Sequence, residues 1–141
     1  MIVVDTSALI AITNHEPERQ RFLEILAQVD KCFFSAVTLL ETRMVTLGRF
    51  GRPGTDRLSE WFAVLKPTIV AFDVVQADAA FAAFQIYGKG VHPKARLNMG
   101  DCAAYALAKT YNLPLLFKGE DFLSTDVASG NALNLPTENS P

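Results

Sequence analysis

Short, mostly apolar runs alternate with longer helical segments along this chain, and this alternation limits the folds that it can adopt. The four runs cover residues 2–4, 31–34, 68–71 and 115–117. Strands that are apolar on both faces are typical of parallel sheets with helices on either side. The sequence therefore predicts a three-layer α/β domain, in which a parallel sheet of four to five short strands is flanked by helices.

The segments between the runs carry helix signals at their ends. Side chains that cap helices precede several of them, and Gly or Pro residues interrupt the pattern elsewhere. Thr6 and Ser7 are predicted to cap the first helix, and Ser35, Thr55 and Asn98 to cap three later ones. Helices are expected at 8–12, 17–29, 36–48, 55–65, 75–87 and 99–111, with a turn at 51–54 and a turn plus a short helical segment at 119–126.

The length of 141 residues suits one domain and is too short for two ordinary ones. Residues 1–128 are expected to form this domain, and residues 129–141 are expected to form a partly flexible tail. No run approaches the roughly 20 apolar residues of a membrane helix, and no basic segment precedes the first apolar run. The protein is therefore expected in the cytoplasm without a membrane partner, with Cys32 and Cys102 as buried free thiols.

Basic residues gather in two segments, although the formal net charge is −2. One segment is a Gly- and Pro-containing loop with Lys89, Lys94 and Arg96. The other contains Arg49 and Arg52. Lys and Arg contacts to phosphates position a nucleic acid without reading its sequence. These five residues are therefore candidates for holding a nucleic-acid backbone.

Four acids fall where an isolated carboxylate would be costly. Asp5 ends the first apolar run, Glu41 shares an apolar helix face, Asp101 lies in the first turn of a helix, and Asp121 follows the last apolar run. A carboxylate beside a core is disfavoured unless it is paired, hydrogen-bonded or bound to a cation. Strand ends and helix N-termini open onto the same edge of such a sheet, where ligands bind. The four acids are therefore predicted to share one cation site.

Each of these acids also has a purely structural explanation when it is taken alone. Asp5, Asp101 and Asp121 could be helix caps or turn residues, and Glu41 could be solvated. Four such coincidences on one sheet edge are a weaker explanation than a shared site. Because the ligand set contains only oxygen, it favours Mg²⁺, with Mn²⁺ as a substitute, over zinc.

Four further polar residues are candidates for a supporting role around the acids. Asp126 could cap a final turn or add a fifth acid to the site. Thr6, Ser7 and Asn98 could cap helices and also orient the neighbouring acids, as residues around metal ligands commonly do.

Four segments resemble the motifs of PIN domains and, within that superfamily, the VapC toxin ribonucleases. They are the opening VVDTSAL at 3–9, the helix with Glu41, NMGDCAAYALA at 98–108, and LFKGEDF at 116–122 followed by Thr125 and Asp126. The resemblance spans residues 1–128 in order and spacing, and its GDCxxYALA and KGxDFxxTD segments are specific.

The resemblance implies a metal-dependent endoribonuclease, the toxin of a type II toxin–antitoxin pair, inhibited by a VapB-type antitoxin and usually a homodimer. It implies that Asp5, Glu41, Asp101 and Asp121 form the acidic Mg²⁺ site, with Asp126 as the second acid of the last motif. The basic residues would then contact the RNA backbone. Hydrolysis by activated water would leave 5′-phosphate and 3′-hydroxyl ends.

Two other classes of protein, one enzymatic and one that binds nucleotides, fit the sequence poorly. A phosphatase of the haloacid dehalogenase type needs a second Asp two residues after the first, where this chain has Ser7. A nucleotide-binding module needs a glycine-rich phosphate loop, which the sequence lacks. The alternative that stays open is a metal-binding module of the same fold that binds RNA without cleaving it.

Overall fold

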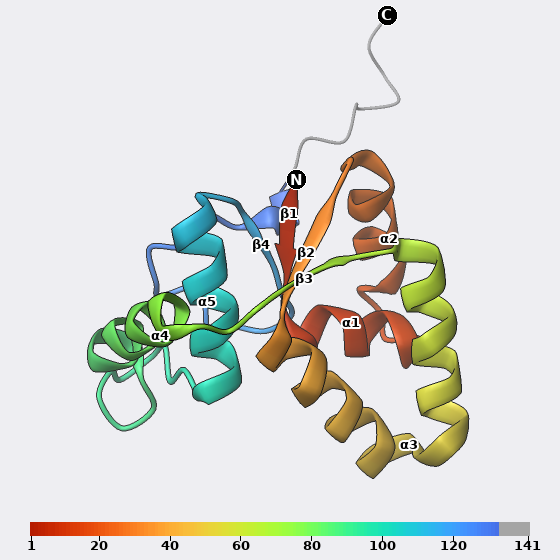
Figure 1. Cartoon of the computed structure of the whole chain (residues 1–141), viewed down its shortest axis with the longest axis horizontal. Helices are drawn as coiled ribbons and strands as arrows, with labels where there is room; N and C mark the ends of the chain where they lie inside the picture. The colour runs from red at the N-terminus through yellow and green to blue at the C-terminus, as the bar shows by residue number, and fades with distance from the viewer. Residues whose placement is uncertain (133–141) are drawn as a thin grey trace, which may run out of the picture.

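Four parallel strands form the sheet of the computed structural model, which describes residues 1–132 (Figure 1). The strands are β1 (Ile2–Val4), β2 (Cys32–Ser35), β3 (Thr68–Val70) and β4 (Leu115–Leu116), in the order β3-β2-β1-β4. The register pairs Val3 with Phe33 on one side and with Leu115 on the other. The predicted α/β class and parallel sheet are confirmed, with four strands.

Helices cover both faces of this sheet. They are α1 (Thr6–Thr13), α2 (Arg19–Gln28), α3 (Ala36–Leu65), α4 (Val74–Tyr87) and α5 (Met99–Tyr111), followed by a 3-10 turn, η1 (Gly130–Ala132). In Figure 1, α4 and α5 lie on one side of the sheet, and α1, α2 and the second half of α3 on the other. The structure thus has three layers.

Alternating side chains of the central strand supply the two cores. Val3 belongs to a buried cluster with side chains of α4 and α5, whereas Ile2 and Val4 belong to a second cluster with side chains of α1 and α2. Successive residues of a strand point to opposite faces, so a central strand must be apolar throughout to serve both clusters. This is why the short run at 2–4 has no polar residue.

The first helix begins earlier than predicted, and its cap is a different residue. Asp5 is the N-cap, since its carboxylate accepts a hydrogen bond from the Ser7 N–H at 3.0 Å, and Thr6 is already helical. The prediction that Thr6 and Ser7 cap this helix is therefore wrong. The caps predicted at Ser35 and Asn98 are confirmed, the latter in a capping box with Asp101.

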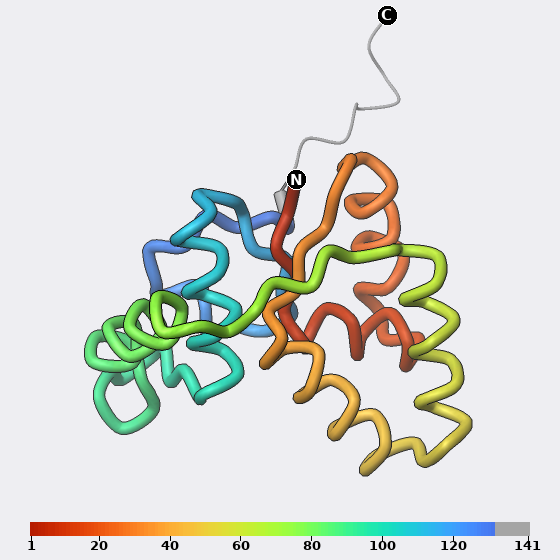
Figure 2. Tube along the Cα trace, viewed as in Figure 1, coloured from red at the N-terminus to blue at the C-terminus, as the bar shows by residue number. Residues whose placement is uncertain are grey.

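The predicted pair of helices at 36–48 and 55–65 forms one element with a sharp bend, seen at the lower right of Figure 2. The bend is at Gly51, whose φ of 62° and ψ of −161° are strained for any residue with a Cβ. Pro53 and Gly54 already lie in the second limb, because proline is tolerated in a first helical turn. The predicted turn at 51–54 is thus too long, and the cap predicted at Thr55 is wrong.

Other differences concern the ends of elements and the last segment. Residues 119–126 form turns without the predicted helical segment. Helix α2 begins at Arg19, two residues after the predicted start. Within residues 1–132, no helix is long and apolar enough to cross a membrane.

Residues 129–132, at the start of the predicted tail, are bonded to the sheet. Asn131 Oδ1 accepts from the Phe117 N–H at 3.2 Å, and Asn131 Nδ2 donates to the Phe117 carbonyl at 2.7 Å. Ser129 forms a parallel bridge with Leu115. The rest of the predicted tail, residues 133–141, lies outside the described residues.

We expect Asn131→Ala to lower the free energy of unfolding by about 1–3 kcal/mol, because it leaves two backbone groups of Phe117 without partners. Chemical denaturation measures this change. Ser129→Ala is the matched control, since the exposed Ser129 Oγ only accepts one bond from Asn131 N. Equal losses in both variants would show that the Asn131 bonds do not secure β4.

Candidate active site

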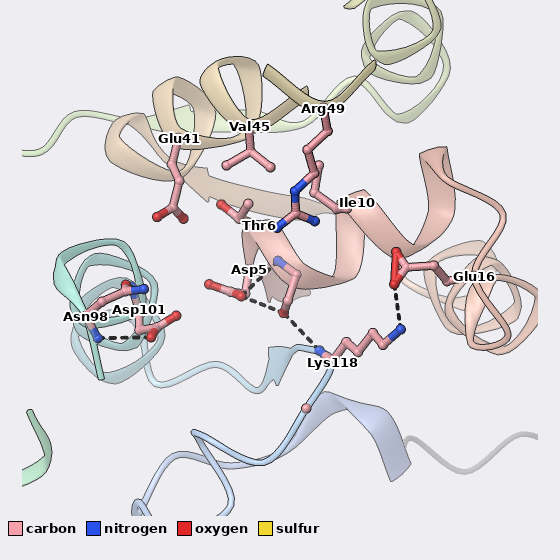
Figure 3. Close-up of a pocket in the computed structure, with 12 residues that line it drawn as sticks. Asp5, Thr6, Ile10, Glu16, Glu41, Val45, Arg49, Asn98, Asp101 and Lys118 are labelled. Atoms are coloured by element: carbon pink, nitrogen blue, oxygen red, sulfur yellow. Dashed lines mark hydrogen bonds and ion pairs between the residues drawn. The ribbon is translucent and has the colours of Figure 1, made fainter. Parts of the chain in front are cut away.

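A pocket of about 400 Å³ lies beyond the carboxyl ends of the strands, between the N-terminal ends of α1 and α5 and residues 41–49 of α3 (Figure 3). Helix N-termini carry partial positive charge, so this edge favours anionic side chains. The pocket is lined by Asp5, Thr6, Ser7, Ile10, Glu16, Glu41, Val45, Arg49, Asn98, Asp101, Lys118 and Gly119.

Asp5 is the most buried acid of the pocket, with 2 % of its surface exposed. Its Oδ2 accepts from the Ser7 N–H at 3.0 Å and from the Ser7 hydroxyl at 2.6 Å. Its Oδ1 is buried and has no hydrogen-bond partner among the described residues. Burial raises the pKa of Asp5 to about 6, and the nearby Glu41 adds to this rise. An unpartnered buried carboxylate oxygen of this kind suits a cation ligand.

Asp101 faces the same space from the first turn of α5 (Figure 3). Its carboxylate accepts from the Asn98 N–H at 3.0 Å, and Asn98 Oδ1 accepts from the Asp101 N–H at 2.9 Å. Burial is the main cause that raises the pKa of Asp101 to about 7, and the negative charges of Asp5, Asp121 and Glu41 raise it further. The predicted role of Asn98 in orienting Asp101 thus has a geometric basis.

Helix α3 brings Glu41 to the pocket through the regular spacing of its residues. Glu41, Val45 and Arg49 lie four residues apart and line the pocket (Figure 3). The neighbouring stripe of Thr38, Thr42 and Thr46 is buried, and α3 packs on α1 there. Residues four apart lie on one face of a helix. The packing of the threonine stripe on α1 therefore fixes the orientation of α3 about its axis, and the adjacent stripe with Glu41 faces the pocket.

Thr6 contributes to that packing. Thr42 Oγ1 donates to Thr6 Oγ1 at 3.1 Å, which joins the first turn of α1 to α3. The predicted supporting role of Thr6 therefore corresponds to a contact between two helices that carry pocket acids at their N-terminal ends. Ser7 supports Asp5 directly through the two hydrogen bonds described above.

The remaining two predicted acids lie outside the pocket lining. Asp121 is exposed, in the turns after β4, although its charge contributes to the raised pKa of Asp101. Asp126 accepts a short hydrogen bond from the Tyr105 hydroxyl and pairs with Lys109 Nζ at 3.1 Å. The Tyr105 bond is the main cause of the lowered pKa of Asp126. Asp126 is thus engaged away from the pocket.

The carboxylate oxygens of the pocket are suitable ligands for a cation, but they are not arranged as a complete ligand set. Within residues 1–132, no group of three or more His, Cys, Asp or Glu side chains is close enough to form a ready metal cluster. The carboxylates of Asp5, Glu41 and Asp101 repel one another. Asp5 and Asp101 also each direct one oxygen to a helix cap. The orphaned Oδ1 of Asp5 and the all-oxygen set fit a hard divalent cation.

Of the predicted basic residues, Arg49 lines the pocket. Arg52, Lys89, Lys94 and Arg96 are exposed and lie outside its lining. The three loop residues belong to a segment held by His92, whose Nδ1 accepts from the Lys94 N–H at 3.1 Å and the Ala95 N–H at 2.9 Å.

Two charged residues of the pocket, Glu16 and Lys118, are not among the predicted site residues. They form an ion pair at 2.5 Å, and Glu16 is the main cause of the raised pKa of Lys118. Lys118 follows an apolar strand at the ligand-binding edge, and this position could have identified it. Glu16 lies in the connection after α1, where no local pattern marks it.

Known proteins are similar to this chain in sequence or in fold. The PIN domain family model matches residues 2–128. Ribonuclease VapC30 of Mycobacterium tuberculosis is 47 % identical over 129 residues, covering 91 % of this chain and 97 % of that protein. The crystal structure of VapC20 from the same organism, described as a sarcin-ricin loop cleaving toxin, superposes with a TM-score of 0.72 at 15 % identity, over 91 % of this chain and 97 % of that one. A chain of the DNA-bound VapBC2 crystal structure from Rickettsia felis gives a TM-score of 0.70 at 16 % identity, over 92 % and 96 %.

Proposed function

Since the chain belongs to the PIN-domain family and, within it, to the VapC ribonucleases, we propose that it is a divalent-metal-dependent endoribonuclease, the toxin of a toxin–antitoxin pair. The observation that carries the metal dependence is the buried, unpartnered Oδ1 of Asp5 in a pocket that Glu41 and Asp101 also line. Without a cation these acids would repel an RNA phosphate.

Asp5 and Asp101 would hold the principal Mg²⁺ ion. Glu41 and Asp121 would complete its ligand shell or bind a second ion. Mn²⁺ would substitute. When bound, the cation would lower the pKa of a nearby water molecule and would neutralise charge on the phosphate. Ser7 and Asn98 orient the two principal acids through their hydrogen bonds. Ile10 and Val45 supply apolar side chains to the pocket wall.

Basic residues flank the pocket on two sides and would hold the RNA backbone. Arg49 and Arg52 come from the bend region of α3, and Lys89, Lys94 and Arg96 come from the loop before α5. These two segments lie on opposite sides of the lower edge of the sheet in Figure 1. A strand of RNA that crosses the pocket between them would contact both, and such contacts position RNA without selecting its sequence.

A VapB-type antitoxin is the proposed protein partner, together with a second copy of the chain in a homodimer. The Rickettsia felis structure supports the first part, since it is a VapBC2 assembly in which one chain has the same fold. Exposed apolar side chains at helical spacing also support a protein partner. Leu40, Met44 and Leu47 are 55–64 % exposed along α3. An amphipathic helix docking on such a stripe is a common recognition mode.

Cleavage of total cellular RNA by purified, antitoxin-free protein tests the function. We expect discrete cuts in Mg²⁺ or Mn²⁺, none in chelator, and none by Asp101→Asn. Mapping the cut ends should give 5′-phosphates and 3′-hydroxyls. RNA binding without cuts by the folded wild type would instead favour the alternative, a non-cleaving RNA-interaction module. A 2′,3′-cyclic phosphate would contradict hydrolysis by activated water.

Gly100→Ala should displace Glu41 without unfolding the domain. A Cβ at Gly100 would lie 2.5 Å from Glu41 Cδ, and the carboxylate is the movable end of a side chain. We expect cleavage to fall about 10- to 100-fold, because a displacement of this size disturbs a catalytic arrangement. Gly48→Ala in α3 is the control, since its Cβ would meet nothing within 4 Å. Full activity of Gly100→Ala would show that the position of Glu41 is unimportant.

A further inference from the structure

A lysine and two glutamates form a second charged cluster at the pocket. Lys118 Nζ lies 2.5 Å from Glu16 Oε1 and 3.1 Å from Glu18 Oε2. The glutamates come from the connection between α1 and α2, and Lys118 follows β4. Figure 3 shows Lys118 and Glu16 on the side of Asp5 away from Asp101. The pocket therefore has an acidic half, formed by Asp5, Glu41 and Asp101, and a second half that contains the Lys118 ammonium group.

The backbone of Lys118 is fixed relative to the buried acid. The Lys118 N–H donates to Ser7 Oγ at 2.9 Å, and the Ser7 hydroxyl donates to Asp5 Oδ2 at 2.6 Å. Strand β4 also pairs with β1, at the end of which Asp5 lies. The ammonium group thus extends from a rigid base beside the place where a phosphate bound to the acidic half would lie.

The partners of Lys118 hold it in a way that RNA could reverse. Two carboxylates surround one ammonium group, so the cluster has an excess negative charge. The side chains of Lys118, Glu16 and Glu18 are 33, 23 and 38 % exposed. Ion pairs with this exposure contribute little to stability. A phosphate oxygen can therefore replace Glu16 at little cost, since an ammonium group binds phosphate as a point charge.

The same glutamates keep the ammonium group out of the acidic half. Lysine side chains are long and flexible, and Asp5, Glu41 and Asp101 would attract a cation. In Figure 3 Lys118 Nζ points toward Glu16 instead of toward Asp5. Glu18 Oε2 lies 3.1 Å from the same ammonium group. The acidic half remains accessible to a divalent ion.

We propose that Lys118 binds an RNA phosphate in the active site, and that Glu16 and Glu18 are positioning residues that hold its ammonium group until the RNA arrives. This inference rests on the proposed function, because it takes RNA as the ligand. It differs from a purely structural ion pair in one measurable respect. Removing Lys118 and removing the charge of Glu16 should change RNA affinity in opposite directions.

The test is binding of a fluorescein-labelled, random-sequence 12-nucleotide RNA to the full chain in Mg²⁺, measured by anisotropy, with cleavage kinetics in parallel. We expect Lys118→Gln to weaken binding about 5- to 10-fold and to reduce the salt slope by about 0.7, the value for one phosphate contact with a single strand. Glu16→Gln should tighten binding about 2- to 5-fold, and only while Lys118 is present.

Two control variants make the same charge changes elsewhere. Lys109→Gln removes a lysine that pairs with Asp126 outside the pocket, and Glu24→Gln neutralises an exposed acid of α2.

Weaker binding in both Lys118→Gln and Glu16→Gln, or no difference from these controls, would overturn the inference, as would a wild type that does not bind RNA. Opposite shifts in affinity without any cleavage would support Lys118 and reject the ribonuclease. Metal-dependent cleavage by the wild type, together with an RNA affinity of Lys118→Gln equal to that of the wild type, would support the ribonuclease and reject the role of Lys118.

Discussion

Asp5→Asn is expected to lower the rate of RNA cleavage by about 1000-fold, which is several kcal/mol of lost transition-state stabilisation. The substitution removes the charge of the buried carboxylate that has an oxygen without a partner. Asparagine is also a good N-cap, so the hydrogen bond that begins α1 can be kept. The loss of activity should therefore occur in a folded protein.

The same variant should gain stability when no metal is present. Burial raises the pKa of Asp5 from 3.8 to about 6, which means that the folded state disfavours its charged form. At pH 7.5 we expect Asp5→Asn to raise the free energy of unfolding by about 2–3 kcal/mol, and the gain should vanish below about pH 4. Activity and stability thus change in opposite directions.

Asp73→Asn is the matched control for both measurements. Asp73 is the N-cap of α4 and its Oδ1 accepts from the Gln76 N–H at 3.0 Å, but it is exposed and outside the pocket. Neither cleavage nor stability should change much in this variant. If Asp5→Asn keeps more than about a tenth of the wild-type rate, Asp5 does not hold a catalytic cation.

Binding of Mg²⁺ or Mn²⁺ should depend steeply on pH. The pKa values of Asp5 and Asp101 are raised to about 6 and about 7, so both carboxyls are partly protonated in weak acid, and a cation must displace these protons. From pH 7.5 to pH 5.5 the affinity should fall about 100-fold, since each displaced proton costs tenfold per unit below its pKa. Calorimetric titration of chelator-treated protein measures this.

The metal-free protein should show the opposite trend in stability. Because both pKa values lie above those of an unfolded chain, the folded state binds more protons between about pH 4 and pH 7, and stability falls as pH rises. Added cation should therefore raise the melting temperature more at pH 7.5 than at pH 5.5. An equal rise at both values would mean that the ion binds away from these two acids.

Local patterns were sufficient to place most of the site. Asp5 ends a strand and Asp101 begins a helix, and both positions follow from short runs of sequence. Glu41 lies on a helix whose spacing can be read directly, so its face was also predictable. Asp121 lies in irregular turns, where no period indicates a direction, and the structure leaves it outside the pocket lining.

Contacts between distant loops were not predictable in this way. Glu16 and Lys118 are 102 residues apart in the sequence and meet because two connections lie at one sheet edge. The bend at Gly51 was indicated by glycine and proline, but its length was not, because proline fits both a turn and a first helical turn. The N-cap of α1 is likewise Asp5 and not Thr6, because β1 ends at Val4 and the helix begins directly after Asp5.

The use of Asp5 and Asp101 in helix caps has a consequence for the order of events in a newly made chain. Each carboxylate acquires its position when the first turn of its helix forms, through bonds to Ser7 or Asn98. The chain can therefore fold before it encounters an ion, unlike small domains whose folding requires metal. Supply of the cation would then control when a finished molecule begins to act, and would not control how many molecules are made.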